Sequence, residues 1–341
     1  MRHIGIDLHS NSFTACYLEN GKQEIIKTFK LQGIEFENFL SDLHLDDEVA
    51  VEATGNSSFF RDKVLSLVKR VAIISPHQFN VIRSSIKKTD KNDARAIAFF
   101  LSKDMLPEAR VKSSLHQQLL GIAQTRDQLV KTRVALLNKV YGMLNGHGLK
   151  IKKEQLTSIK GFEKAIAFEG LSTIEQATIK IIKSELFSLR ENIKELEKLM
   201  VEHAKGISGY ENLLSIKGIG PTSAAIFLAN ISDINNFDDT GKLASYFGIT
   251  PTVYQSNDKC INGRITKRGS KLARRTLVQC TLIAKRYSPY FHEFYEKIKK
   301  QRGAGKAIIA TARKLLNTIF YTLKNNWLFE DSSNFKINTC N

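Results

Sequence analysis

The sequence lacks the long apolar runs found in membrane and secreted proteins. Its 341 residues contain no run of about 18 apolar residues, the length that a membrane-spanning helix requires. The first ten residues, MRHIGIDLHS, carry acid and histidine where a signal peptide has an apolar core. We therefore expect a cytoplasmic protein with no membrane partner.

Cysteine is also scarce. The chain has four cysteines, at positions 16, 260, 280 and 340, and no two of them form a C-x-x-C pair. This spacing argues against a disulfide framework and against a zinc knuckle.

Acidic residues are too few to balance the basic ones. The chain has 51 Lys and Arg against 34 Asp and Glu, which gives a formal net charge of +17 and a pI of about 9.6. Such an excess favours polyanionic partners, because cations on a protein bind phosphates and release counterions. The charge is spread over several segments rather than one amphipathic helix, which favours nucleic acid over a membrane surface. We expect association with the nucleoid.

The first part of the chain alternates strands and helices. Apolar and β-branched patterns predict strands over 2–8, 12–18, 24–29, 48–52 and 71–75, and helices over about 34–44 and 57–69. A further helix begins near Asp90. Three meander strands followed by alternating helices and strands match a ribonuclease-H-like, or RuvC-like, α/β architecture.

The middle of the chain is predicted to be helical. Apolar residues recur at steps of three and four from about 115 to 144 without a proline, which indicates one long helix. A second run keeps a strict heptad spacing: Ile179, Ile182, Leu186, Leu189, Ile193, Leu196 and Met200. Such a seam is buried within its own domain, in an antiparallel coiled coil of one chain, or between two chains. We expect a coiled-coil linker that supports a dimer or tetramer.

A third, mostly helical part begins near residue 208. The stretch LLSIKGIGPTSAAIFLANI, 213–231, is typical of a helix-hairpin-helix motif, whose turn amides bind a backbone phosphate. The expected organisation is a RuvC-like domain over 1–112, a helical linker over 113–207, a C-terminal domain over 208–330 and a tail over 331–341.

One basic segment contains no acid at all. Between Lys259 and Arg286 there are nine Lys or Arg and no Asp or Glu, and Gly263 and Gly269 permit close backbone approach. This pattern predicts a surface that lies against phosphates. The candidate nucleic-acid-binding residues are Lys87, Lys88, Lys91, Lys217, Arg264, Lys267, Arg268, Lys271, Arg274 and Arg275.

Acidic residues stand at corresponding ends of the predicted N-terminal elements. Asp7 lies on the first strand, Glu52 ends the fourth, and Asp90 and Asp93 open a helix on one of its faces. The first and fourth strands of a ribonuclease-H-like sheet are neighbours, so the four carboxylates meet at one edge. Because like charges cannot crowd without a cation, this arrangement predicts a Mg²⁺ or Mn²⁺ site for phosphoryl transfer. The alternative is that Asp90 is an N-cap and Asp93 a first-turn acid.

Two blocks of sequence together resemble the DEDD transposases of the insertion-sequence 110 family, over nearly the whole chain. The first block is GIDLHS, VEATG and KTDKNDARAIA. The second is LLSIKGIGPTSAAIFLANI, followed by LASYFGITP and GRITKRGSKLARRTL. The resemblance implies a recombinase that excises and inserts its element, guided in one branch of the family by a structured bridge RNA.

The resemblance also implies a serine nucleophile, and Ser256 in PTVYQSNDK occupies the matching position. Asn257 follows it where many relatives have glycine. Ser270 is the rival, and either serine is alternatively a helix cap or a phosphate donor. Pro251 predicts that Ser256 lies on a loop. In the family, the serine of one subunit meets the carboxylates of another, and its attack on DNA gives a covalent phosphoserine link.

Two other functions are consistent with the same residues. One is a metal-dependent junction nuclease in which water is the nucleophile and the C-terminal half only clamps DNA. The other is a non-catalytic nucleic-acid-binding protein. A covalent protein–DNA adduct distinguishes the recombinase from the nuclease, and metal-dependent cleavage distinguishes both from the third.

Overall fold

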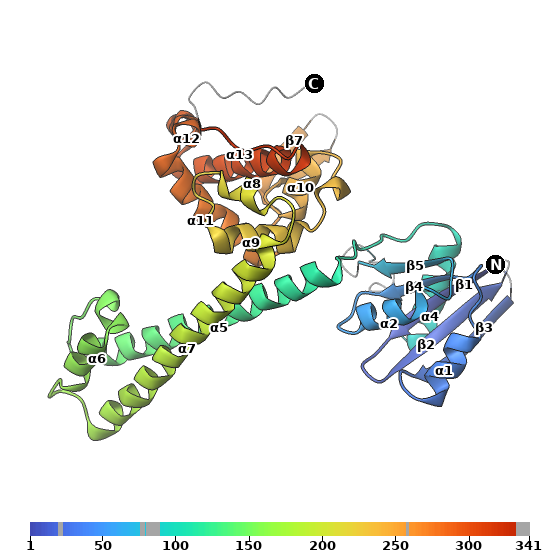
Figure 1. Ribbon diagram of the computed structural model, residues 1–341, viewed down its shortest axis with the longest axis horizontal. Helices are drawn as coiled ribbons and strands as arrows, with labels where there is room; N and C mark the ends of the chain where they lie inside the picture. Colours follow the sequence, from blue (N-terminus) through green and yellow to red (C-terminus); the bar gives the residue numbers. More distant parts are fainter. Residues whose placement is uncertain (20–22, 76–78, 80–88, 257–258, 332–341) are drawn as a thin grey trace. The chain divides into compact units, whose positions relative to one another are not determined.

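The chain forms two compact units, residues 1–111 and 112–341, in a computed structural model (Figure 1). The structure describes residues 1–19, 23–75, 79, 89–256 and 259–331. Lys87 and Lys88, two of the predicted phosphate-binding residues, lie outside the described residues. No helix in the described ranges is long and apolar enough to cross a bilayer.

The first unit is built on a five-stranded sheet in the order β3-β2-β1-β4-β5. The strands are β1 (Arg2–Leu8), β2 (Ser12–Glu19), β3 (Gln23–Lys30), β4 (Glu48–Glu52) and β5 (Arg70–Ile74). The pairs β1–β2 and β2–β3 are antiparallel, whereas β1–β4 and β4–β5 are parallel. The prediction that the first and fourth strands are neighbours is confirmed.

Helices cover both faces of this sheet. They are α1 (Ile34–Ser41), α2 (Ser57–Val64) and α4 (Asp90–Ser102). The predicted helices over 34–44 and 57–69 are present but end earlier. Ile4 and Ile6 of β1 belong to a core with Phe39 of α1 and Phe60 of α2. The alternate residues of β1 therefore face α4, and Asp7 is one of them.

Two long helices dominate the start of the second unit, and they pack side by side (Figure 1). They are α5 (Ser114–Gly146) and α7 (Thr173–Lys205), joined through the 3-10 turn η1 (Lys153–Thr157) and the short α6 (Ile159–Ile166). Their direction is antiparallel, because Arg126 of α5 pairs with Glu197 near the end of α7, while His147 pairs with Glu175 near its start.

The heptad seam of α7 is buried inside the chain. Ile179, Ile182 and Leu186 belong to a core with Val140 and Leu144 of α5. The intra-chain alternative therefore accounts for these apolar residues without a second subunit. The seam no longer argues for a dimer, and the oligomeric state stays a prediction.

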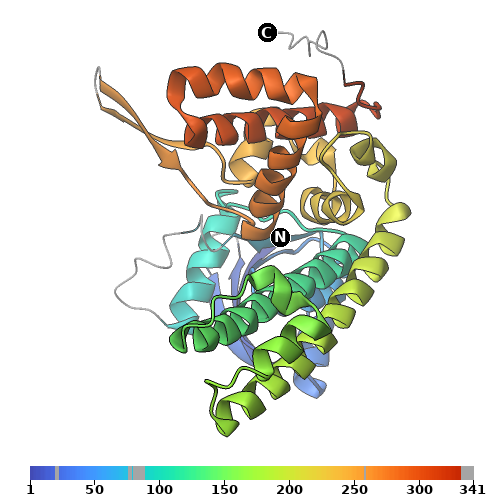
Figure 2. The same cartoon turned by 90° about the vertical axis from the view of Figure 1, so that its left-hand side faces the viewer.

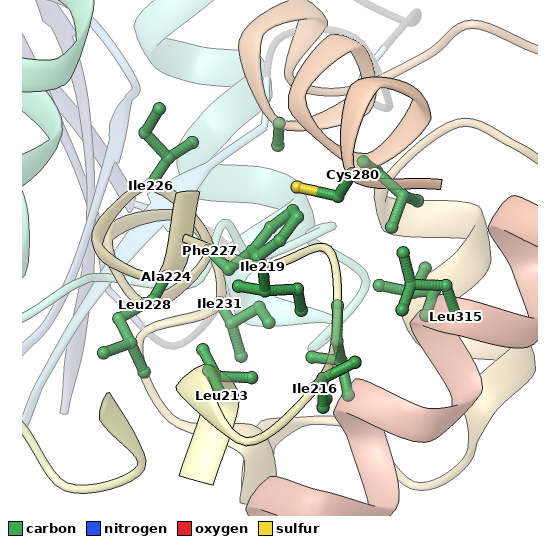
Figure 3. Close-up of a cluster of buried hydrophobic side chains, with 14 of the residues drawn as sticks. Leu213, Ile216, Ile219, Ala224, Ile226, Phe227, Leu228, Ile231, Cys280 and Leu315 are labelled. Atoms are coloured by element: carbon green, nitrogen blue, oxygen red, sulfur yellow. The ribbon is translucent and has the colours of Figure 1, made fainter. Parts of the chain in front are cut away.

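The remaining elements form a helical body with one β-ribbon. The elements are α8 (Tyr210–Leu214), α9 (Pro221–Ile231), η2 (Ile234–Asn236), α10 (Thr240–Tyr246), β6 (Pro251–Ser256), β7 (Lys259–Ile265), α11 (Lys271–Tyr287), α12 (Pro289–Arg302) and α13 (Ala304–Lys324). In the core, Cys280 of α11 and Leu315 of α13 lie around Ile219 and Phe227 (Figure 3). The antiparallel β6–β7 ribbon projects from these helices (Figure 2).

Candidate active site

A glycine allows α4 to lie directly on β1. A Cβ atom on Gly5 would clash with the carbonyl oxygen of Ala94 and the backbone nitrogen of Ala98. Ala94 and Ala98 are themselves fully buried and small. This close packing of strand and helix brings the start of α4 to the end of β1, where Asp7 lies.

The start of α4 is capped by a residue other than the predicted one. Thr89 is the N-cap: its Oγ1 accepts a hydrogen bond from the backbone N–H of Asn92 at 3.3 Å. The interpretation of Asp90 as the N-cap is therefore wrong. Asp90 and Asp93 both lie in the first helical turn, where the partial positive charge of the helix favours carboxylates.

The side chain of His9 lies close to both Asp7 and Asp90. The Nε2 atom of His9 lies 3.5 Å from Oδ2 of Asp7 and 3.3 Å from Oδ2 of Asp90. One ligand atom from each of these three residues lies within 4.8 Å of the others. Asp7 is buried, whereas His9 and Asp90 are exposed, so the cluster opens to solvent on one side.

The other two predicted carboxylates act on Asp7 electrostatically. The pKa of Asp7 is raised to about 6: burial is the largest cause, the negative charges of Asp90, Asp93 and Glu52 also raise it, and His9 lowers it. Glu52 is half-buried at the end of β4, next to β1. The other three carboxylates that the sequence singled out therefore lie within electrostatic reach of Asp7.

The residues present fit a divalent metal ion. Carboxylate oxygens are the ligands that Mg²⁺ and Mn²⁺ prefer, and oxygens of Asp7 and Asp90 lie close together here. Burial first, and the neighbouring negative charges second, disfavour the charged form of Asp7 and raise its pKa, and a bound cation would offset both effects. Among the described residues, Asp7 and Asp90, with His9 between their charges, lie close enough together to hold such an ion, whereas Asp93 and Glu52 are related to Asp7 through the effect of their charges on its pKa.

His9 was not among the predicted site residues. Its backbone N–H donates to the carbonyl of Ser12 at 2.9 Å, and its carbonyl accepts from Nδ2 of Asn56 at 2.8 Å. The only signal in the sequence is its position two residues after Asp7 in GIDLHS. That spacing does not determine where the ring points once the strand has ended at Leu8.

The predicted nucleophile lies on a strand rather than on a loop. Ser256 is the last residue of β6 and is paired with Lys259 at the start of β7. The prediction from Pro251 that Ser256 lies on a loop is wrong. Pro251 is the first residue of β6, an edge strand of a two-stranded ribbon, where the missing N–H of proline is tolerated. Nearby on the ribbon, Val253 and Tyr254 are 56% and 69% exposed, so this stretch stands clear of the core.

Ser270 has a defined structural role. It is the N-cap of α11, and its Oγ accepts a hydrogen bond from the N–H of Ala273 at 3.2 Å. The glycine next to it, Gly269, has a φ of 90° and passes so close to Tyr246 that a Cβ would clash with that residue's carbonyl. These two residues therefore shape the turn that leads into α11.

The predicted phosphate-binding residues fall into two groups. Arg264, Lys267, Arg268 and Lys271 are exposed in and after β7, and Lys91 is exposed on α4. By contrast, Arg274 donates to the carbonyl of Phe247 at 3.2 Å, and Arg275 forms an ion pair with Asp127 of α5. The two adjacent arginines thus have partners inside the second unit.

Lys217 in the predicted hairpin also has an acidic partner. Its Nζ lies 3.2 Å from Oδ2 of Asp331, whose Oδ1 accepts from the Ser288 hydroxyl. Gly218 has a φ of 100° and packs against the backbone of α11 at Cys280 and Ala284. The glycine is thus required for helix packing, whether or not the turn binds phosphate.

Two protein-family models match this chain, and together they include residues of both units. A family model described as a transposase, of the DEDD type of insertion sequence 110, matches residues 4–148. A second, described as the transposase family IS116/IS110/IS902, matches residues 210–296.

Several known proteins are similar to this chain over most of their length. The transposase for insertion sequence element IS1111A of Coxiella burnetii is 25% identical, over 91% of this chain and 86% of its own. A probable family 20 transposase of Pseudomonas aeruginosa is 27% identical, over 82% of each chain. The pilin gene-inverting protein of Moraxella bovis is 26% identical, over 96% of this chain and 97% of its own. The two family models together match most of the chain. This protein therefore belongs to the IS110/IS116 family of insertion-sequence transposases, which are enzymes that catalyse DNA strand cleavage and transfer.

Proposed function

We propose that the first unit is a ribonuclease-H-like, RuvC-like catalytic domain whose carboxylates hold the metal that assists DNA strand cleavage. The observation that carries this proposal is the buried Asp7 beside Asp90, with Glu52 and Asp93 within electrostatic reach. A bound Mg²⁺ or Mn²⁺ polarises a phosphoryl oxygen and offsets the charge that develops during phosphoryl transfer.

The chain's own residues supply position and charge. The first turn of α4 presents Asp90 and Asp93, and the exposed Lys91 between them is available to a DNA phosphate. The exposed Arg264, Lys267, Arg268 and Lys271 bind backbone phosphates in the second unit, so most of the affinity is independent of sequence and sensitive to salt.

Ser256 is the proposed nucleophile. Its Oγ loses a proton and forms a bond to the scissile phosphorus, the phosphorus–oxygen bond to the leaving strand breaks, and the released strand end takes up a proton. A hydroxyl of a second strand then attacks the phosphoserine and frees the serine. Because the phosphodiester energy is kept in the covalent link, strands are exchanged without ATP.

A guide and a partner subunit complete the proposal. The guide is a structured bridge RNA, for which the net charge of +17 is suitable. In a composite site, Ser256 of one subunit meets the carboxylates of another within a dimer or tetramer. The helix-hairpin-helix around Lys217 adds a phosphate contact when Lys217 leaves its ion pair with Asp331 and binds a DNA phosphate instead.

The test is metal-dependent cleavage of DNA carrying the element ends, with the guide RNA present. We expect Asp90→Asn to lose cleavage by at least about a hundredfold and to bind DNA within about twofold of wild type, since affinity comes from Lys and Arg. Asp62→Asn, which removes an exposed carboxylate of α2, is the matched control and is expected to cleave normally.

Each other outcome identifies a different function. Cleavage at the normal rate in Asp90→Asn would remove that residue from the site. Metal-dependent cleavage by the wild-type protein with no covalent adduct would indicate a junction nuclease that uses water. Binding without cleavage under all conditions would indicate a non-catalytic nucleic-acid-binding protein.

A further inference from the structure

We propose that His9 is a metal ligand beside Asp7 and Asp90, and that its nitrogen makes the site prefer Mn²⁺ to Mg²⁺. This inference rests on the proposed carboxylate site and adds to it a residue of a different chemical type. It predicts which divalent ion occupies the site when both are present.

The spacing of the three side chains suits one ion. Two ligands at right angles around an ion held at about 2.1 Å lie roughly 3 Å apart. His9 Nε2 lies 3.3 Å from an oxygen of Asp90 and 3.5 Å from an oxygen of Asp7. Small side-chain adjustments therefore bring all three atoms into one coordination sphere.

The backbone of His9 is held where the ring can reach the carboxylates. The turn after β1 is closed by the hydrogen bond from the His9 N–H to Ser12. Asn56, just before α2, binds the His9 carbonyl from the other side. His9 itself is 48% exposed at its side chain, so solvent and an entering ion reach the ring.

The chemistry of imidazole decides the metal preference. Mg²⁺ is a hard ion that binds oxygen and retains several waters, whereas first-row transition metals accept an imidazole nitrogen readily. A site made only of carboxylates discriminates weakly between Mg²⁺ and Mn²⁺. One nitrogen ligand in place of a water favours Mn²⁺.

The competing explanation is that His9 is only a cationic partner of the two aspartates. In that case an entering metal ion displaces the ring, and no bond forms between nitrogen and metal. Spectroscopy separates the two explanations, because a directly bound imidazole nitrogen couples magnetically to Mn²⁺.

The experiment is a titration of the full-length protein with Mn²⁺, followed by electron paramagnetic resonance, with electron spin echo detection of nitrogen coupling. We expect a ¹⁴N coupling in the wild type that is absent in His9→Ala. The same substitution is expected to weaken Mn²⁺ binding by at least about tenfold and Mg²⁺ binding, measured by competition, much less. His44→Ala is the matched control, because His44 is an exposed histidine of the same unit outside the cluster.

Failure of this inference is distinguishable from failure of the carboxylate site. If Asp7→Asn abolishes Mn²⁺ binding while wild type and His9→Ala show the same affinity and no nitrogen coupling, His9 is not a ligand and the carboxylate site stands. If Asp7→Asn binds Mn²⁺ as tightly as wild type, the carboxylate site itself is refuted.

Discussion

Gly5 of β1 lies directly against the backbone of α4 at Ala94, with no room for a side chain between them. We predict that Gly5→Ala pushes α4 away from the sheet and destabilises the first unit by about 1–3 kcal/mol. The same displacement moves Asp90 and Asp93 from Asp7, so metal binding and cleavage are lost even where the protein remains folded. Urea unfolding and Mn²⁺ titration measure the two effects separately.

A glycine elsewhere provides the control for that experiment. Gly121 is exposed on α5, and a Cβ there meets no atom within 4 Å. Gly121→Ala is expected to stabilise the second unit by up to about 1 kcal/mol, since alanine favours a helix. Equal effects of the two substitutions would contradict the packing argument.

Two arginines of the basic segment are predicted to behave differently. Arg275 pairs with Asp127, which is only 10% exposed at its side chain and also contacts Lys131 at 2.8 Å. Arg275→Ala is therefore expected to cost about 1–2 kcal/mol of stability, because it leaves the largely buried carboxylate of Asp127 with Lys131 as its remaining cationic partner. Thermal unfolding with and without the substitution measures this loss.

Arg268 is exposed and is the matched comparison. Arg268→Ala should change stability by less than about 0.5 kcal/mol, while lowering the slope of log affinity for DNA against log salt by about one. If Arg275→Ala altered the salt slope and left stability unchanged, Arg275 would be the phosphate contact instead.

The choice between the two serines is tested by covalent adducts on a denaturing gel. Ser256→Ala is expected to bind DNA and RNA normally and to form no DNA-linked species. Ser270→Ala should form the adduct, although losing the N-cap of α11 costs about 0.5–2 kcal/mol. Ser270→Asn restores a capping side chain and should recover that stability. An adduct that persists in Ser256→Ala and vanishes in both Ser270 variants would identify Ser270 as the nucleophile.

A composite site predicts complementation between two inactive proteins. A mixed oligomer of Asp90→Asn and Ser256→Ala subunits contains one site with an intact Asp90 from one subunit and an intact Ser256 from the other. Mixing the two variants on guide RNA and DNA should therefore restore adduct formation to about half or less of the wild-type level. No recovery, in a mixture that light scattering shows to be oligomeric, would indicate that each subunit uses its own serine.

Lys112 predicts a specific dependence of stability on alkaline pH. Its Nζ donates to the carbonyl oxygens of Ala229 and Asn230 at the end of α9, and burial lowers its pKa to about 8 from 10.5. Between about pH 8 and pH 10.5, Lys112 is protonated in the unfolded chain but has largely lost its proton in the folded chain. Raising the pH removes the proton that favours the unfolded chain, so the contribution of Lys112 to stability rises with pH. The free energy of unfolding of the wild type, measured relative to that of Lys112→Met, should increase by roughly 1–3 kcal/mol between about pH 8 and 10.5. A constant difference between the two proteins across this range would contradict the assignment.

Local patterns in the sequence determined the elements of the first unit. The apolar strand EVAVE and the alternation around Gly5 and Asp7 predict β4 and β1 almost to the residue, because side chains of a strand alternate between two faces. The positions of Glu52, Asp90 and Asp93 at the ends of elements follow from the same patterns, and the neighbouring placement of β1 and β4 was predicted with them.

The tertiary structure decided what those patterns leave open, which is the partner of each side chain. The seam of α7 suits a second subunit as well as α5, and only the folded chain shows that α5 covers it. A count of arginines does not separate Arg275, paired with Asp127, from the exposed Arg268. His9 reaches Asp90 only because a turn closed by Ser12 and Asn56 directs it there. Sequence periodicity encodes which face of an element is buried, whereas contacts between residues far apart in the chain depend on how the elements pack.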